Sequence, residues 1–502
     1  MPARRKAPPS VLFIASEAQP FAKSGGLADV VGALPGAIAR LGWRVTVALP
    51  KYRGVNAGTL IERFPVAVGG YAQDVGFFDA PMGNGGNRGD GPGETARALL
   101  VDCPPLYDRE ALYGPNNTDY PDNARRFAVL VRAALEFAGR QEAAPTVVHA
   151  HDWQAGLAPV YLKTMYASHP VLGGTPSILT IHNLAYQGNF PADWLPRLDI
   201  GWDEFTLDGL EYWGQVSFLK AGITRAELVT TVSPRYAEEI QTPDAGAGFD
   251  GIIRARRDRL VGILNGIDTR EWDPAHDPWL PEPFDARDLS GKRKAKAHVL
   301  AHYSLPFDDA ALERPLIGMV SRMVDQKGLD LIASLSDVLP RLEASFVILG
   351  TGDPHYQDFW KRMAAEYPDR IGVKVGFDNP LAHLIEAGAD MFLMPSHFEP
   401  CGLNQMYSLR YGTVPIVRAV GGLADTVRDH TPRARQATGF VFKDYTAEAL
   451  RAAIERALRL FANKEKWREL QLTGMAQDHS WDRSAAEYVK LYKRAAGLAA
   501  KG

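Results

Sequence analysis

The chain is too long for one ordinary domain, and its composition is that of a globular protein with a large core. It has 502 residues, 46% of them hydrophobic and 23% charged, so two or three domains are expected. The formal net charge of -3 argues against a nucleic-acid binder and offers no broad cationic surface for a membrane. Cys103 and Cys401 are too few cysteines for a disulfide framework. The first apolar run is too short for a signal segment or a membrane span, and we expect a cytoplasmic protein.

The chain begins with a predicted strand, a glycine turn and a predicted helix. Residues 11–15 form an apolar run typical of a buried strand, and residues 27–41 carry apolar residues at helical spacing. Between them lie Lys23, Gly25 and Gly26. Backbone N–H groups at a helix start, together with a lysine, suit an anion. Taken alone, two glycines after a first strand are more often a tight turn.

A near copy of this turn occurs in the last fifth of the chain. Gly421-Gly422-Leu423-Ala424-Asp425 nearly repeats Gly25-Gly26-Leu27-Ala28-Asp29, and each copy follows an apolar run. The repeat indicates two α/β halves, although a repeat this short also arises by coincidence.

Strand-like and helical patterns alternate through most of the chain, which predicts parallel α/β architecture. After a strand at 44–49 we expect a less regular region up to residue 102. Its glycine-rich segment, 83–94, is interpreted as a hairpin tip, and the alternative is a recognition loop. The first half then has a helix at 123–140 and strands at 146–153, 177–183 and 228–233. The second half has strands at 316–321, 346–350, 373–377, 391–395, 414–417 and 439–442, and helices at 447–461 and 481–497.

Polar residues stand where two of the predicted strands end. Asp152 and His182 each follow an apolar run, and ligands of open α/β sheets bind outside the carboxyl ends of strands. A lone residue of this kind is more often a loop or capping residue, but several together favour a site. The composition then changes between residues 246 and 313, and we place a domain boundary near residue 260.

The second half contains two further candidate groups. Arg322 ends a strand, and Lys327 follows five residues later. An arginine fork and a lysine charge together suit a diphosphate, and the alternative is two solvated cations.

Glu399 follows a buried strand and precedes a turn that opens a helix. Its carboxylate suits sugar hydroxyl groups, and the N–H groups of Gly402, Leu403 and Asn404 suit a phosphate. Cys401 is a nucleophile only if His397 assists it, and a small buried thiol lining the pocket is the favoured interpretation.

Six ordered motifs give the chain a family resemblance. They are Lys23-x-Gly25-Gly26-Leu27, His149-Ala150-His151-Asp152-Trp153, His182-Asn183-Leu184-Ala185-Tyr186-Gln187-Gly188, Leu264-Asn265-Gly266-Ile267-Asp268, Ser321-Arg322-x4-Lys327-Gly328 and Phe398-Glu399-Pro400-Cys401-Gly402-Leu403. The set resembles bacterial glycogen synthases and plant starch synthases, and it extends over residues 10–490.

The resemblance implies an α/β GT-B fold, in which two Rossmann-like doubly wound domains face across a cleft. It implies a first domain of residues 1–260, a second of 261–479, and a C-terminal helix at 480–502 that crosses back to the first. The implied reaction is transfer of glucose from ADP-glucose to the non-reducing end of an α-1,4-glucan, with retention at the anomeric carbon.

The resemblance also implies roles for individual residues. Arg322 and Lys327 would hold the diphosphate, and Glu399 would bind glucose hydroxyls. Asp152 and His182 would line the sugar and acceptor side, and these two with Arg322, Lys327 and Glu399 are the implied catalytic residues. The remaining implied substrate contacts are Lys23, Gly25, Gly26, Asp29, Asn265, Phe377, Cys401, Gly402, Leu403 and Asn404, with Phe377 stacking on adenine.

Three positions depart from the family pattern, which more often has arginine at His397, threonine at Asn404 and tyrosine at Phe377. The motifs contain no pair of carboxylates of the kind that retaining glycosidases use, which favours front-face attack assisted by the leaving diphosphate. No metal-ligand spacing is present, so we expect neither a metal nor another cofactor. Two alternatives stay open: a catalytically idle glucan-binding relative, and a phosphorylase, for which no cofactor lysine is identified.

Overall fold

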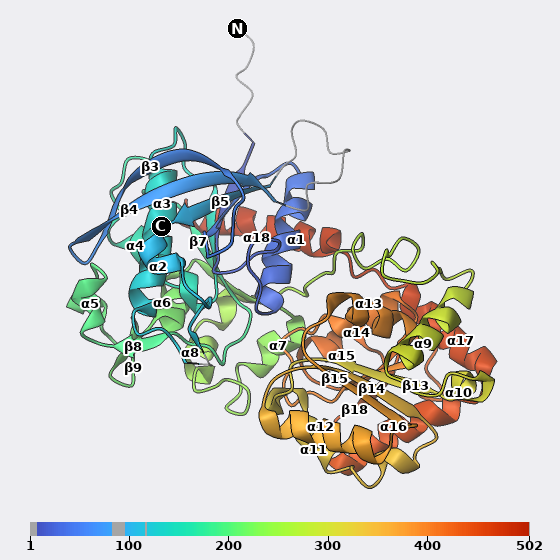
Figure 1. Cartoon of the computed structure of the whole chain (residues 1–502). Coiled ribbons are helices and arrows are strands. Elements are labelled where there is room, and N and C mark those ends of the chain that lie inside the picture. The colour runs from blue at the N-terminus through green and yellow to red at the C-terminus, as the bar shows by residue number, and fades with distance from the viewer. Residues whose placement is uncertain (1–7, 83–95, 116–117, 501–502) are drawn as a thin grey trace. The chain divides into compact units, whose positions relative to one another are not determined.

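The computed structural model describes residues 8–82, 96–115 and 118–500 (Figure 1). The glycine-rich segment 83–94 lies outside the described residues, so its interpretation as a hairpin tip stays a prediction.

The chain divides into two compact units. The first comprises Met1–Val232, Ala237–Gly266 and Trp481–Gly502, and the second comprises Ser233–Tyr236 and Ile267–Ser480. The predicted boundary at residue 260 is six residues too early. The reason is that β12 (Leu260–Gly262) pairs in parallel with β11 (Leu228–Thr231) and so extends the sheet of the first unit.

The first unit is built on a mostly parallel sheet. Its described strands are ordered β12-β11-β7-β6-β1-β2-β5-β4-β3. A second, small sheet has the order β8-β10-β9, and its strands come between β7 and β11 in the sequence. The strands other than β11 and β12 are β1 (Ser10–Ile14), β2 (Arg44–Pro50), β3 (Thr59–Val68), β4 (Tyr71–Pro81), β5 (Arg97–Asp102), β6 (Val147–His151), β7 (Ser177–Ile181), β8 (Asn189–Pro191), β9 (Glu211–Tyr212) and β10 (Gln215–Ser217).

Helices flank this sheet. They are α1 (Gly26–Arg40), α2 (Pro104–Tyr107), α3 (Asn123–Gly139), η2 (Trp153–Ala155), α4 (Ala158–Lys163), α5 (Trp194–Arg197), η3 (Trp202–Glu204), α6 (Phe218–Arg225), α8 (Asp250–Ala255), η4 (Arg257–Arg259) and α18 (Trp481–Ala499), while α7 (Pro234–Glu239) begins in the second unit. The central strands β6 and β7 are buried at every residue, as expected for parallel strands covered on both faces.

The region predicted to be less regular contains the longest strands of the chain. β3 and β4 pair antiparallel from Thr59 to Asp79, and β4 pairs antiparallel with β5. Side chains of β3 alternate between exposed and buried over its second half. One face of this hairpin is therefore solvated, and its two strands lack the continuous apolar runs that marked the predicted strands.

The last helix, α18, belongs to the first unit although it follows the second in the sequence. Its residues Trp481, Tyr488 and Tyr492 share an apolar cluster with Phe13 of β1 and Leu34 of α1, and α18 packs along α1 (Figure 1). The helix that the resemblance implied to cross back to the first domain is therefore found there.

The second unit has a fully parallel sheet in the order β15-β14-β13-β16-β17-β18. Its strands are β13 (Leu316–Val320), β14 (Ser345–Gly350), β15 (Ile371–Val375), β16 (Met391–Met394), β17 (Val414–Arg418) and β18 (Phe440–Phe442). Its helices are α9 (Ser290–His302), α10 (Asp309–Glu313), η5 (Asp325–Lys327), α11 (Leu329–Ala333), η6 (Leu339–Arg341), α12 (Pro354–Glu366), α13 (Asn379–Gly388), α14 (Asn404–Arg410), α15 (Gly421–Thr426), α16 (Ala447–Phe461) and α17 (Lys464–Met475).

Helices cover both faces of this sheet. Alternate residues of β14 enter two different apolar clusters: Phe346 and Ile348 join one, and Val347 and Leu349 join the other. This alternation is the period of two that a strand buried on both faces requires. Among the described residues, no helix is both long and apolar enough to span a bilayer.

Candidate active site

The carboxyl edge of the second unit's sheet carries most of the candidate residues. The chain order reverses between β13 and β16, which lie side by side. Open α/β sheets bind ligands at such a reversal point, because loops leave the two strands in opposite directions there. Arg322 and Lys327 follow β13, and Glu399 follows β16.

Lys327 and Glu399 meet directly at this point. The Lys327 Nζ lies 2.6 Å from the Glu399 Oε2, and the exposed fractions of the two side chains are 18% and 7%. Ser396 Oγ donates a second hydrogen bond of 3.0 Å to the same oxygen. No described residue donates to Glu399 Oε1, so the turn holds the carboxylate by one oxygen and leaves the other for a ligand.

The turn that carries Glu399 is fixed by the second glycine motif. Gly421 has a φ of +41°, and a Cβ atom there would overlap the carbonyl oxygen of Glu399. A Cβ atom on Gly422 would overlap Cys401 in the same way, and the Gly422 N–H donates to Glu399 O at 3.3 Å. These glycines are therefore required for the close approach of two backbone segments.

Asn404, at the start of α14, ties the turn to β13, because its Nδ2 donates to the Val320 carbonyl at 2.7 Å. Gly402 has a φ of +71°, and Leu403 precedes α14 as its N-cap residue. Cys401 is buried and forms no disulfide bond. The His397 ring stacks on Tyr445, with centroids 4.5 Å apart.

Arg322 and Phe377 also lie at the carboxyl edge of this sheet, after β13 and β15 respectively. Arg322 Nη2 donates to Gln326 at 3.1 Å. β15 ends at Val375, two residues earlier than predicted, which leaves Phe377 in the loop before α13 with 82% of its surface exposed. Since β15, β14, β13 and β16 are consecutive in the sheet, an aromatic face, two cations and a carboxylate follow one another along one edge.

In the first unit, Asp152 and His182 lie at the carboxyl ends of the neighbouring strands β6 and β7. Asp152 Oδ1 accepts a 2.7 Å hydrogen bond from the His182 backbone N–H. Asp152 also has a φ of +54°, a strained conformation for a residue other than glycine that is found mainly at functional sites. Burial raises the pKa of Asp152 to about 7, although the backbone hydrogen bonds from His182 and Asn183 oppose that shift.

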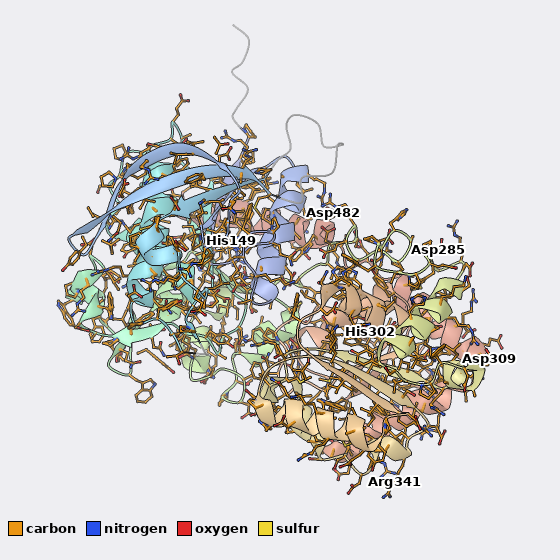
Figure 2. All side chains as sticks on the ribbon, viewed as in Figure 1. His149, Asp285, His302, Asp309, Arg341 and Asp482 are labelled. Atoms are coloured by element: carbon orange, nitrogen blue, oxygen red, sulfur yellow. The ribbon has the colours of Figure 1, made fainter. Side chains whose placement is uncertain are left out.

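Three buried histidines connect this edge to α18. His151 Nδ1 and His182 Nε2 are hydrogen-bonded at 2.9 Å, and the rings of His149 and His151 lie 4.2 Å apart. His149, labelled in Figure 2, forms a hydrogen bond of 2.9 Å between its Nδ1 and the Tyr492 hydroxyl group. Burial lowers the pKa of His149 and of His182 to about 3 and that of His151 well below its ordinary value. All three rings are therefore neutral near pH 7.

The first glycine motif differs from the second. Gly25 and Gly26 are exposed, and a Cβ atom on either would meet nothing within 4 Å. The sequence predicts that N–H groups at the helix start suit an anion, whereas the N–H groups of Ser24 and Gly25, just before α1, donate to the carboxylate of Glu17. Lys23 Nζ lies 2.6 Å from Asp29 Oδ1, so the lysine is placed beside the loop by a carboxylate on α1.

Glu17 is a candidate that the sequence did not indicate. It is buried, it accepts hydrogen bonds from Ser24 Oγ at 2.6 Å and from the Tyr113 hydroxyl, and it follows β1 at the reversal point between β1 and β6. A carboxylate three residues after a strand was a visible signal, but no local pattern paired it with the glycine turn.

Asn265 is also buried in the first unit, and its Oδ1 has no hydrogen-bond donor among the described residues. Within the same residues, no group of three or more His, Cys, Asp and Glu side chains is arranged to hold a metal ion. The structure thus gathers the predicted residues at two strand edges, one in each unit.

Comparison with known proteins assigns the family. The model of the starch synthase catalytic domain matches residues 10–255, and that of glycosyl transferases group 1 matches residues 307–470. The chain is 46% identical over 488 residues to a glycogen synthase of Koribacter versatilis, covering 97% of this chain and 98% of that protein. It is 47% identical over 487 residues to a glycogen synthase of Anaeromyxobacter dehalogenans, covering 96% and 99%.

Comparison with solved structures supports the same fold and family. The catalytic domain of Arabidopsis thaliana starch synthase IV, bound to ADP and acarbose, has a TM-score of 0.87 at 32% identity and covers 98% of this chain and 100% of that one. A sucrose-phosphate synthase of Thermosynechococcus elongatus has a TM-score of 0.60 at 18% identity, covering 97% and 98%, and shares the fold. The predicted GT-B class and the resemblance stated from the motifs are thereby confirmed, and the chain belongs to the glycogen synthase family of glycosyltransferases.

Proposed function

We propose that the protein transfers glucose from ADP-glucose to the 4-hydroxyl group at the non-reducing end of an α-1,4-glucan, with retention and release of ADP. The ion pair of Lys327 and Glu399 carries the proposal, because it puts a cation suited to phosphate within 2.6 Å of a carboxylate suited to sugar hydroxyls. The related starch synthase IV structure, bound to ADP and acarbose, supports an adenine nucleotide and a glucan as substrates.

The donor's ADP moiety is assigned to the second unit. Adenine stacks on the exposed ring of Phe377, and the diphosphate binds Arg322, Lys327 and the backbone N–H groups of Gly402, Leu403 and Asn404. Negative charge develops on the diphosphate as its bond to glucose breaks, and preorganised cations stabilise that charge. Because these side chains supply positive charge at the leaving group, we propose that the reaction needs neither a metal nor another cofactor.

The glucose moiety is assigned to Glu399. Lys327 and Ser396 both bind its Oε2, and its Oε1 accepts from a glucose hydroxyl group. Cys401, buried in the same turn, lines the pocket as an apolar wall. A carboxylate already bound to a lysine is a poor nucleophile, which favours a route without a covalent glucosyl-enzyme.

In that route the acceptor attacks from the face that the diphosphate leaves. The bond between the anomeric carbon and the phosphate oxygen breaks, the bond to the acceptor O4 forms, and the O4 proton moves to the departing phosphate. The first-unit residues Asp152, His182 and Asn265 bind the sugars, while Lys23, Gly25, Gly26 and Asp29 contact the donor. Neutral His182 offers a hydrogen bond without a charge that would repel an oxocarbenium-like carbon.

The test is an assay of ADP release and glucan extension with glycogen and either ADP-glucose or UDP-glucose, with a chelator present. We expect faster extension with ADP-glucose, no loss of activity on chelation, and α-linked product by NMR of the anomeric protons. Equal rates with both donors would contradict the ADP assignment, and inactivation by the chelator would contradict the metal-free one. Absence of turnover with an intact fold would favour an idle glucan-binding relative.

A matched pair of variants tests the role of the carboxylate. Glu399→Gln removes the negative charge that holds Lys327 and should abolish most turnover. Glu343→Gln alters an exposed glutamate of the same unit and should leave turnover unchanged. We also propose a cytoplasmic location, in keeping with Cys103 and Cys401, which form no disulfide bond.

A further inference from the structure

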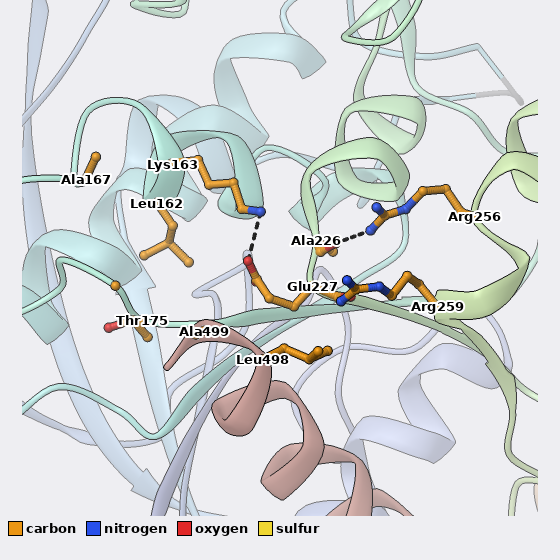
Figure 3. A pocket seen from close by; sticks show the side chains of 11 residues that line it. Leu162, Lys163, Ala167, Thr175, Ala226, Glu227, Arg256, Arg259, Leu498 and Ala499 are labelled. Atoms are coloured by element: carbon orange, nitrogen blue, oxygen red, sulfur yellow. Dashed lines mark hydrogen bonds and ion pairs between the residues drawn. The ribbon is translucent and has the colours of Figure 1, made fainter. Parts of the chain in front are cut away.

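We propose that the first unit contains a second anion site, separate from the candidate active site, which binds a small organic phosphate. The site is a pocket of about 540 Å³ lined by Lys163, Arg256 and Arg259 together with Glu227, Leu162, Ala167, Gly174, Thr175, Ala226, Leu498 and Ala499 (Figure 3). This volume lies within the range of small-molecule pockets.

The pocket lies at the amino ends of strands whose carboxyl ends carry candidate catalytic residues. Thr175 precedes β7 by two residues, and Glu227 immediately precedes β11. His182 follows the other end of β7, a strand of five residues that spans roughly 16 Å. A ligand in this pocket therefore occupies the opposite edge of the sheet and does not overlap the glucosyl-transfer site.

The charges of the pocket do not cancel. Among the described lining residues, Glu227 is the one carboxylate, and it is already satisfied. Lys163 Nζ lies 2.8 Å from Oε1, and Ser177 donates to Oε2 from its N–H at 2.6 Å and from its hydroxyl at 3.0 Å. Figure 3 shows this ion pair together with the two arginines, whose dashed contact from Arg256 runs to Ala226. Two positive charges therefore exceed what the carboxylate balances.

The two arginines have only backbone acceptors. Arg256 Nη2 donates to the Ala226 carbonyl, and Arg259 Nη1 donates to the Glu227 carbonyl at 3.3 Å. Among the residues that the structure describes, neither guanidinium has a carboxylate within 4 Å, and the Nε of Arg256 is buried without any acceptor. A buried donor of this kind costs free energy unless a ligand or water satisfies it.

Mutual repulsion adds to this cost. Burial lowers the pKa of Arg256 below its ordinary value, the charge of Arg259 lowers it further, and the charge of Glu227 opposes this shift. An anion between the two guanidinium groups would neutralise their repulsion and accept hydrogen bonds from them. Adjacent arginine forks match phosphate oxygens in geometry as well as charge.

The rest of the lining favours a phosphate ester over free phosphate. Leu162, Ala167 and Leu498 form an apolar wall, which a bare phosphate cannot use but the carbon skeleton of an ester can cover. Thr175 adds a side-chain hydroxyl group for a polar substituent.

The binding test uses the full-length protein without donor or glucan, so its outcome does not depend on the proposed function. Ribose 5-phosphate, glycerol 3-phosphate, inorganic phosphate and ribose are titrated calorimetrically. Because Arg322 and Lys327 are a competing phosphate site, each titration is repeated in the Lys327→Ala protein. We expect saturable binding of both esters that survives Lys327→Ala, weaker binding of inorganic phosphate and none of ribose.

Three arginine variants locate the site. Arg259→Gln and Arg256→Gln should each weaken ester binding roughly tenfold or more, the usual effect of losing a charge-assisted hydrogen bond. Arg257→Gln changes an exposed arginine between them that does not line the pocket and should bind normally. Arg256 makes a partly buried contact, so a melting curve checks its fold, and Arg259→Gln gives an independent result if that variant is unstable.

The proposal is overturned if ester binding is unchanged in Arg259→Gln, or if Arg257→Gln weakens it equally. It is overturned as well if no saturable binding remains in the Lys327→Ala protein. Inorganic phosphate binding as tightly as the esters would contradict the assignment of an organic ligand.

Discussion

The ion pair of Lys327 and Glu399 orients two side chains, one assigned to the diphosphate and the other to glucose. Among the described residues, Lys327 Nζ has one hydrogen-bond partner, Glu399 Oε2 at 2.6 Å, and the pair is mostly shielded from solvent. Holding a long, flexible lysine before substrate arrives removes part of the entropic cost of binding a diphosphate.

Lys327→Ala should therefore lower kcat/KM by roughly 10²–10³-fold, about 3–4 kcal/mol of transition-state stabilisation. The expected loss is in kcat, because the charge on the leaving group grows in the transition state. Steady-state kinetics with ADP-glucose measures it, with Lys361→Ala, an exposed lysine of the same unit, as the control. A higher KM with an unchanged kcat would instead assign the lysine to ground-state binding.

Asp152 gives a prediction about pH. Its pKa is raised by burial from 3.8 to about 7 in the folded protein, so between these values the unfolded chain has released a proton that the folded chain retains. Because the folded state binds more protons over this range, the contribution of Asp152 to the free energy of unfolding decreases as pH rises from about 4 to about 7. It is constant above that.

Asp152→Asn should remove this dependence while keeping an oxygen to accept the His182 N–H. Urea unfolding midpoints of the variant and the parent are compared from pH 4 to pH 8, and the variant should gain relative stability as pH increases. Asp258→Asn, at an exposed aspartate, should show no such trend. A constant difference for Asp152→Asn across this range would rule out the raised pKa.

At the scale of elements, two nearly identical glycine motifs serve different purposes. Both lie at the starts of helices, α1 and α15, yet Gly422 packs closely against Cys401 while Gly26 has open space around it. The second motif lets a loop pack on the Glu399 turn, whereas the first keeps an exposed loop free of side chains.

Gly422→Ala and Gly26→Ala thus form a matched pair at equivalent positions. Gly422→Ala should destabilise the second unit by about 1–3 kcal/mol or more through overpacking and should displace Glu399. Gly26→Ala should leave the free energy of unfolding within about 0.5 kcal/mol of the parent. Thermal and chemical unfolding of both variants measures the contrast, and equal stabilities would refute the steric explanation.

At the scale of the molecule, each unit has its own parallel sheet and core, and α18 completes the core of the first after the chain has built the second. The candidate nucleotide residues belong to the second unit, while Asp152, His182 and the anion pocket belong to the first.

Hydrogen exchange of the full chain can therefore locate ADP without reference to how the units are arranged. Saturating ADP should slow amide exchange in peptides covering residues 321–328 and 399–406, because a ligand stabilises the segments that it orders. Peptides beside the pocket, residues 172–177 and 254–260, should be unaffected. Protection confined to the first unit would contradict the assignment of the nucleotide site.

The sequence by itself determined much of this description. Apolar runs ending in Asp152, His182, Arg322 and Glu399 identified parallel strands and the edge at which a ligand binds, since both signals are local. The ordered motifs identified the family. The hairpin of β3 and β4 was not predicted, because its strands have one solvated face and lack the continuous apolar runs that marked the predicted strands.

Only the tertiary structure decided which of these residues meet. Lys327 and Glu399 are 72 positions apart, and His149 and Tyr492 are 343 apart. Glu17 accepts hydrogen bonds from the turn that was predicted to suit an anion, and Arg256, in the region where the composition changes, lines a pocket. Periodicity reports the face on which a side chain lies, but such contacts depend on strand order and on the path of the connecting loops, which no local pattern encodes.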